Sequence, residues 1–137
     1  MRSSLVLVSA GLVASLFVAT GLAVAGVKYD DPVQVSVSSK YAMGSLGSAR
    51  NSSGTLQAIG CSVDGWVYNG NGYSAVSCSA QDSSGNYAYC YTPNSDTMAR
   101  AVTGMTGDSG IYFEWDATGA CTYIEIDNRS YWAPKQP

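Results

Sequence analysis

Apolar and polar positions alternate over a long central stretch, and this alternation is the main structural signal in the chain. The stretch runs from Ile59 to Thr92 and contains two turn signals, Asn69-Gly70 and the segment from Asp82 to Asn86. Because successive side chains of a strand point to opposite faces, the alternation predicts strands with one buried face. We therefore expect a three-stranded antiparallel meander made of two consecutive hairpins.

Asn69-Gly70 sets the register expected for the first hairpin. A two-residue type I′ turn needs positive φ at both central positions, which Asn-Gly tolerates well. With this pair at the tip, Cys61 lies opposite Cys78 at a non-hydrogen-bonded position, where the Cα atoms are close enough for a disulfide. A turn at Gly70-Asn71, or a longer loop over residues 69–72, is the competing arrangement.

The two faces of the meander differ in chemistry. The apolar face carries Ile59, Cys61, Val63, Val67, Val76, Cys78, Ala80, Ala88 and Cys90. The opposite face, here called the aromatic face, carries Trp66, Tyr68, Tyr73, Tyr87, Tyr89 and Tyr91, with Asp64, Ser77, Ser79 and Gln81 among them. A slip of one residue would mix the two sets, so the separation supports the register.

The second turn, over residues 82–86, predicts a three-residue loop with its glycine in the left-handed conformation. This turn places Cys78 opposite Cys90, at a hydrogen-bonded position that is less suited to a bridge. Four cysteines allow three pairings, and the sequence alone does not decide between them. We favour Cys61–Cys78 together with Cys90–Cys121, and Cys78–Cys90 is the rival.

The segments on either side of the meander are less regular. Strict alternation from Val33 to Ser39 predicts a half-buried strand. The stretch from Lys40 to Thr55 is rich in glycine and serine, which predicts a long loop with at most one short strand over Tyr41 to Ser45. Near the C-terminus, Tyr131-Trp132 is expected to hold a polar tail against the body of the domain.

One helix is expected after the meander. The segment from Pro93 to Val102 has apolar residues that share a helical face, and Ser95 or Asp96 can cap its N-terminus. We expect two or three turns, packed over one end of the sheet.

A third hairpin is predicted from Ile111 to Ile126. Asp116 and Gly119 suit the first and fourth positions of a type I turn, which gives a four-residue loop. In this register Trp115 faces Ala120, and Cys121 points away from the apolar face. A bridge from Cys121 to the meander would therefore need the hairpin to offer its second face, or to contain a bulge.

The N-terminus has the features of a signal peptide. Arg2 is the only charge before an apolar run, and Ala23 to Ala25 form an A-x-A cleavage signature. We expect residues 1–25 to be a signal peptide and 26–137 to be a single secreted β domain. An uncleaved anchor over residues 5–25 is the alternative, since the run is about long enough to span a bilayer.

Composition agrees with an extracytoplasmic domain and excludes several classes of function. Seven Lys and Arg residues stand against ten Asp and Glu, so the chain is a poor candidate for nucleic acid or anionic membranes. The four cysteines of a secreted or periplasmic chain are best explained as disulfides. We predict an all-β fold with one short helix, a disulfide-stapled antiparallel sandwich or partly closed barrel of about six to eight strands.

Catalytic and cofactor chemistry has little support in the sequence. The chain has no histidine, which excludes histidine-dependent triads and the usual zinc ligand sets, and no glycine-rich phosphate loop, so we expect no cofactor. Glu114 and Glu125 share a predicted outer face and form the one carboxylate pair that could serve a hydrolase. The turn aspartates, Asp82, Asp108, Asp116 and Asp127, are better explained by Asx-turns than by calcium.

The aromatic face is the remaining candidate for function. It could be a second core face, covered by the N-terminal strand or by the long loop. It could instead bind a ligand, or other copies of the chain, because exposed aromatic patches usually have a partner. We predict a non-enzymatic module that binds polysaccharide or another cell-surface component through this face, with Asp64 among its binding residues. A self-assembling structural subunit is the alternative.

Overall fold

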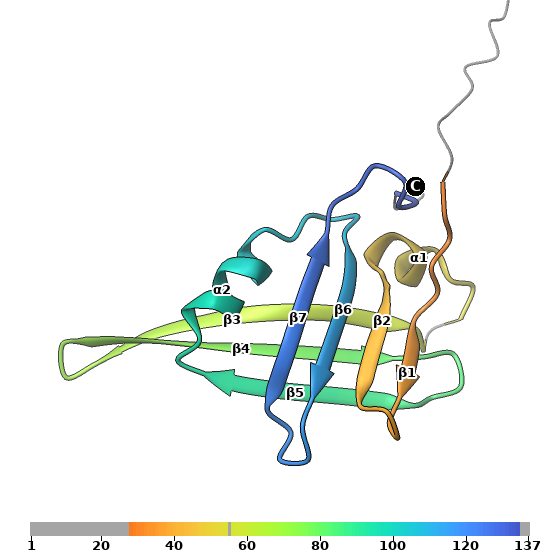
Figure 1. The fold of residues 1–137 in the computed structure, drawn as a ribbon. Helices are drawn as coiled ribbons and strands as arrows, with labels where there is room; N and C mark the ends of the chain where they lie inside the picture. Colours follow the sequence, from red (N-terminus) through yellow and green to blue (C-terminus); the bar gives the residue numbers. More distant parts are fainter. Residues whose placement is uncertain (1–27, 55, 135–137) are drawn as a thin grey trace, which may run out of the picture.

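The computed structural model describes residues 28–54 and 56–134 of the 137-residue chain, so the predicted signal peptide lies outside the described residues. Two antiparallel sheets pack face to face, and the strands of one run across those of the other (Figure 1). The four-stranded sheet has the order β1 (Gln34–Ser36), β2 (Tyr41–Ser45), β6 (Gly110–Trp115), β7 (Cys121–Asp127). The three-stranded sheet consists of β3 (Ala58–Tyr68), β4 (Asn71–Gln81) and β5 (Tyr87–Pro93). This is the predicted antiparallel sandwich, and within the described residues the sheets do not close into a barrel.

The predicted register of the meander is confirmed. Cys61 pairs with Cys78 and Trp66 pairs with Tyr73. The tip is a two-residue turn in which Asn69 has a φ of 50° and Gly70 a φ of 78°, as a type I′ turn requires. The turn between β4 and β5 also has its expected form, and places Cys78 opposite Cys90.

The third hairpin differs from its prediction in loop length. The backbone N–H of Asp116 donates to the oxygen of Ala120 at 3.1 Å, and that of Gly119 donates to the oxygen of Asp116 at 3.2 Å. Gly119 has a φ of 83°, so this loop repeats the geometry of the turn between β4 and β5. The loop thus has three residues rather than the expected four, and Trp115 pairs with Cys121 instead of Ala120.

A β-bulge in β7 turns Cys121 toward the core. On β6, Trp115 pairs with Cys121, whereas Glu114, the residue before Trp115, pairs with Tyr123. Thr122 therefore has no partner, and the side chains change faces at this point. Cys121 is buried, with 4% of its surface exposed, and its predicted outward orientation is wrong for this reason.

The structure has the disulfides Cys61–Cys78 and Cys90–Cys121, the two pairs favoured from the sequence, although the register predicted for the third hairpin conflicted with the second of them. The first lies within the three-stranded sheet, and the second joins the two sheets. The Cys90–Cys121 bridge lies at a corner where the sheets also share two hydrogen bonds. The backbone N–H of Tyr91 donates to the oxygen of Gly119 at 3.0 Å, and the hydroxyl of Thr92 donates to the oxygen of Cys121 at 3.0 Å.

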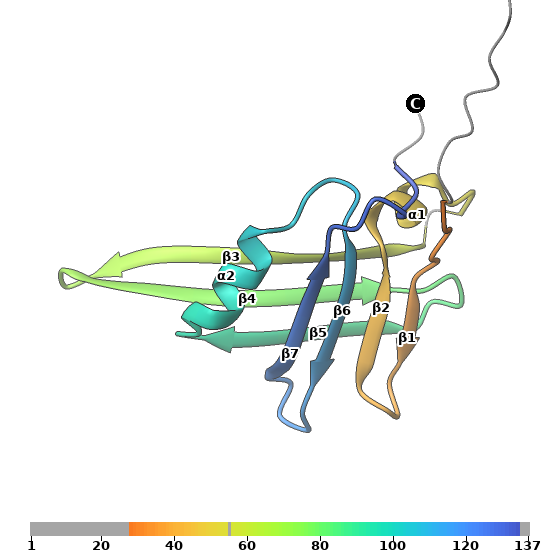
Figure 2. The ribbon, with the colours of Figure 1, turned by 45° about the horizontal axis from the view of Figure 1, so that its top comes forward.

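The described part of the chain contains two short helices where one was predicted. Helix α2 (Asp96–Thr103) has the expected position, begins at the Ser95 cap and packs Val102 into the core. It lies over β3 and β4 beside β7, and so covers a part of the three-stranded sheet that the second sheet leaves uncovered (Figure 2). Helix α1 (Leu46–Asn51) lies in the stretch predicted as a loop, and Ser45 caps it. None of the described helices is long and apolar enough to cross a membrane.

The β3–β4 hairpin projects beyond the sandwich. Its last part, residues 65–74 and here called the hairpin arm, pairs only with itself and extends past α2 in both ribbon views (Figures 1 and 2). Val67 continues the apolar face of β3, but in the arm it is 75% exposed because no described segment packs against it. The burial expected of this face therefore ends where the arm begins.

The C-terminal segment is held against the body, as its aromatic pair predicts. Trp132 lies on Gly110, where an added Cβ atom would come within 2.6 Å of the indole ring. Tyr29 and Trp132 form a parallel bridge, and the Tyr29 N–H donates to the oxygen of Tyr131 at 2.8 Å. The segment therefore covers one end of the four-stranded sheet.

Candidate functional site

The aromatic face of the three-stranded sheet is exposed. Its exposed fractions are 43% for Trp66, 64% for Tyr68, 58% for Tyr87, 51% for Tyr89 and 41% for Tyr91. Tyr73 is half-buried and Asp64 is exposed. No segment of the described chain forms a lid over this face, so among the described residues it is not a second core.

The rings of the aromatic face form two groups. Alternate residues of β5, Tyr87, Tyr89 and Tyr91, form a row with a repeat of about 6.8 Å, the rise of two strand residues. In the hairpin arm, Trp66 and Tyr73 are stacked at 5.9 Å between ring centroids, and Tyr68 lies near the tip. The two groups share one face but are distinct surfaces.

A row of non-aromatic residues separates the two groups of rings, and serines lie beside it. Asp64, Ala75 and Pro93 form a cross-strand row between them. Next to this row, the hydroxyls of Ser62 and Ser77 are 2.9 Å apart. The face therefore combines flat rings with neutral hydroxyls and one carboxylate.

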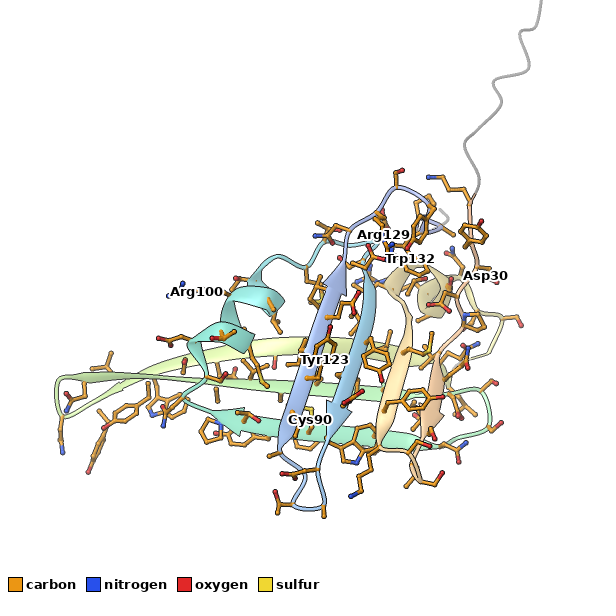
Figure 3. The ribbon with its side chains drawn as sticks, viewed as in Figure 1. Asp30, Cys90, Arg100, Tyr123, Arg129 and Trp132 are labelled. Atoms are coloured by element: carbon orange, nitrogen blue, oxygen red, sulfur yellow. A yellow bond between two sulfur atoms is a disulfide. The ribbon has the colours of Figure 1, made fainter. Side chains whose placement is uncertain are left out.

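A second aromatic surface, which the sequence reasoning missed, lies on the outer face of the four-stranded sheet. The rings of Tyr41 and Tyr112 stack at 5.8 Å, and Tyr123 meets Tyr112 edge-on at 5.9 Å. Figure 3 shows Tyr123 on this outward side of β7. The alternation of side chains in β6 and β7 could have predicted that Tyr112 and Tyr123 share this face. Tyr41 could not be added to them, because it lies in a segment whose composition predicts a loop.

The two glutamates of this face accept hydrogen bonds from tyrosines. The hydroxyl of Tyr112 donates to Glu114 at 2.6 Å, and that bond raises the pKa of Tyr112 to about 12. The hydroxyl of Tyr123 donates to Glu125 at 3.2 Å, which raises the pKa of Tyr123. Each glutamate is thus engaged by a tyrosine two residues earlier on its own strand. The arrangement favours a structural role for the pair.

Two of the turn aspartates form Asx-turns. Oδ1 of Asp82 accepts the backbone N–H groups of Ser84 and Asn86, both at 2.9 Å. Burial alone would raise the pKa of Asp82, but hydrogen bonds from the side chain of Asn86 and from the backbone of Asn86 and Ser84 lower it. Asp116 accepts from the hydroxyl and N–H of Thr118, which lower its pKa in the same way. Hydrogen bonds within each turn explain these residues without calcium.

Three sulfur atoms, of Cys78, Cys90 and Cys121, lie within 4.8 Å of one another. All three belong to disulfides, and no cysteine is free. The cluster is therefore a junction of two bridges and not a set of thiolate ligands. Disulfides of this kind are typical of an oxidising, extracytoplasmic compartment.

A cavity of about 220 Å³, here called the end cavity, lies at the end of the four-stranded sheet that the C-terminal segment covers. Residues from four separate segments line it, including Asp31, Met43, Tyr112, Glu125, Tyr131 and Trp132. Because these residues are far apart in the sequence, no local pattern could have predicted the cavity.

Comparison with known proteins gives no match to a family model, a curated protein or a solved structure.

Proposed function

We propose that this protein is an extracytoplasmic, non-enzymatic binding module that holds polysaccharide on its aromatic face. The observation that carries the proposal is the exposure of the β5 tyrosine row, in which each ring is more than 40% exposed. A monomeric domain rarely leaves a patch of large aromatic side chains uncovered without a partner. The two disulfides support an extracytoplasmic location, where such a partner is found.

The chemistry of the face favours a neutral, hydroxyl-rich polymer. Tyrosine rings offer flat apolar surface together with a hydroxyl that can hydrogen-bond at the edge, and they lose little conformational entropy on binding. Serine and glutamine side chains lie opposite the row, since Ser77 pairs with Tyr91, Ser79 with Tyr89 and Gln81 with Tyr87. A sugar ring can stack on the tyrosines while its hydroxyls bind these polar neighbours.

A pull-down on insoluble polysaccharides tests the proposal. We expect the protein to be retained on at least one glycan. Tyr89→Ala and Tyr91→Ala should each weaken retention up to about tenfold, the effect of losing one well-placed aromatic contact. Tyr123→Ala is the matched control, because Tyr123 is also about half exposed, at 48%, but lies on the other sheet. Absence of retention on every glycan, or equal losses in all three variants, would overturn the proposal.

Self-assembly is a second candidate, and the hairpin arm is the observation that favours it. The arm exposes Val67 and Tyr68 on opposite faces, at 75% and 64%, so a second copy of the chain could pack on either side. Light scattering separates the two functions. A monomer that is retained on glycan supports binding, whereas large species that disappear in a Val67→Ser variant support assembly.

A further inference from the structure

The end cavity has rigid aromatic walls. Tyr112 is held by stacking on Tyr41 and by its hydrogen bond to Glu114. The ring of Tyr131 contacts that of Trp132 at 4.7 Å, and its hydroxyl donates to Asp127 at 2.9 Å. These contacts fix the rings in the absence of any ligand, so the walls are preformed.

The same cavity has an excess of negative charge. Asp127 is neutralised by Arg129, whose guanidinium it binds in an ion pair. Asp31 and Glu125 remain, and within the described chain no group donates a hydrogen bond to the carboxylate of Asp31. Burial, and to a lesser degree the neighbouring Asp30, raises the pKa of Asp31. The carboxylate of Asp31 therefore lacks the positive partner that its partial burial calls for.

One wall already holds a cation within the protein. The guanidinium carbon of Arg129 lies 4.9 Å from the centroid of the Tyr131 ring, within the range of a cation–π contact. Figure 3 shows Arg129 and Trp132 close together at this end of the sheet. The ring of Tyr131 thus lies where a positive group is favourable, although Arg129 itself is committed to Asp127.

We propose that the end cavity binds a compact organic cation of the alkylammonium class, held between Tyr112, Tyr131 and Trp132 and paired with Asp31 and Glu125. Aromatic rings combined with carboxylates are the side chains that recognise such cations, because the ring faces attract positive charge without needing hydrogen-bond donors. The volume, about 220 Å³, lies below the range of about 300–1,000 Å³ usual for drug-sized ligands, so the ligand is a small headgroup.

The Nε1 atom of Trp132 is buried and has no acceptor among the described residues, so a ligand in the cavity meets the ring of Trp132 and not its N–H group. Choline and tetramethylammonium are compact cations of the proposed class. This site lies on the opposite sheet from the aromatic face, so it goes beyond the proposed function and stands or fails separately from it.

Calorimetric titration of the protein with tetramethylammonium, with choline and with the neutral carbon isostere of choline tests the proposal. We expect Kd values on the order of 1 mM for the two cations, which is typical of a few cation–π contacts. The isostere should bind at least about fivefold more weakly. Equal binding of the isostere, or no binding of either cation, would overturn the proposal.

Charge variants locate the binding. Asp31→Asn and Glu125→Gln should each raise the Kd for choline about fivefold, whereas Asp64→Asn, the same charge change on the other sheet, should leave it unchanged. Nuclear Overhauser contacts between the choline methyl groups and the indole of Trp132 provide a check that needs no variant, and contacts to Trp66 instead would overturn the assignment. Co-sedimentation with phosphatidylcholine vesicles then distinguishes a lipid headgroup from a free cation, and either source agrees with the site.

Discussion

At the scale of single residues, Asp127 shows how one carboxylate organises the C-terminal segment. It accepts the backbone N–H of Arg129 at 3.0 Å, the Nε–H of the same residue at 2.8 Å, and the hydroxyl of Tyr131 at 2.9 Å. The hydrogen bond from the Arg129 side chain is the main reason why the pKa of Asp127 falls to about 2. The wall of the end cavity therefore depends on an ionised Asp127.

This dependence predicts an acid-sensitive contribution to stability. The pKa of Asp127 is about 2 in the folded protein, below its value of about 3.9 in an unfolded chain. The stabilisation is therefore fully present above the unfolded value and is lost as the pH falls toward 2. Asp127→Asn should lower the free energy of unfolding at neutral pH by on the order of 1 kcal/mol, because solvent around the 64% exposed Arg129 side chain screens the pair.

Urea unfolding of the wild type and of Asp127→Asn, measured at pH 7 and again near pH 2, provides the check. The difference between the two proteins should shrink at the lower pH. Asp64→Asn is the control, since Asp64 is exposed, and it should change stability little at either pH. A constant difference across the pH range would show that Asp127 acts through packing and not through its charge.

At the scale of elements, the sequence predicted hairpins well where a turn signal and a face pattern agree. Asn69-Gly70 and the separation of apolar from aromatic residues both indicate the same register, and the structure has that register. The third hairpin had no such agreement, because β7 reverses its alternation after Cys121. The bulge at Thr122 brings Cys121 and the isoleucines of β7 to the same face. The shorter loop could have been predicted from the Asp-x-x-Gly sequence at residues 116–119, which repeats that of the turn between β4 and β5.

Other elements could not be read from local sequence because tertiary contacts create them. Helix α1 has only six residues, too few to be stable alone, and forms because Ser45 caps it and Leu46 is buried. The aromatic face could be listed residue by residue from the register, but its exposure depends on which segments pack over it. The end cavity needs four separate segments, so it follows only from the fold.

The bulge yields a prediction for β7. Deleting Thr122 should remove the bulge and leave Cys121 and Ile124 two positions apart, so that both still point to the core. We expect the Cys90–Cys121 bridge to be retained, because the shortened strand then alternates without interruption from Cys121 to Ile126. This bridge closes a loop with a sequence separation of 31, so it stabilises the folded state by about 3–4 kcal/mol.

Counting free thiols in the folded protein checks this prediction. The Thr122 deletion should expose no free thiol and keep both bridges. Deletion of Gly54 is a suitable control, because it lies in an exposed connection with no neighbour near its Cβ position, and both bridges should remain there too. Two free thiols in the Thr122 deletion alone would show that the bulge itself is needed to bring Cys121 to Cys90.

At the scale of the whole molecule, the two disulfides stabilise different parts of the sandwich. Cys61–Cys78 staples neighbouring strands of one sheet, whereas Cys90–Cys121 ties that sheet to the other. Because Cys78 and Cys90 are paired across β4 and β5, the two bridges meet inside the core. A free thiol at this junction would lie beside an intact disulfide, which is the arrangement needed for thiol–disulfide exchange.

A Cys61→Ala variant creates that thiol. The Cys78 thiolate can attack Sγ of Cys90, forming a Cys78–Cys90 bridge and releasing Cys121 as a thiolate, so no external oxidant is consumed. In the folded protein Cys90–Cys121 should persist, because exchange would cut the link between the sheets. In urea near the unfolding midpoint this constraint is lost, and the shorter Cys78–Cys90 loop should form.

Peptide mapping after thiol alkylation should therefore show Cys78–Cys90 fragments that increase with urea. Cys61→Ala with Cys78→Ala is the control: it should keep Cys90–Cys121 at every urea concentration and lose about 3 kcal/mol of stability with the bridge. A Cys78 thiol that is fully alkylated at every urea concentration, with no Cys78–Cys90 fragment, would show that the junction does not exchange.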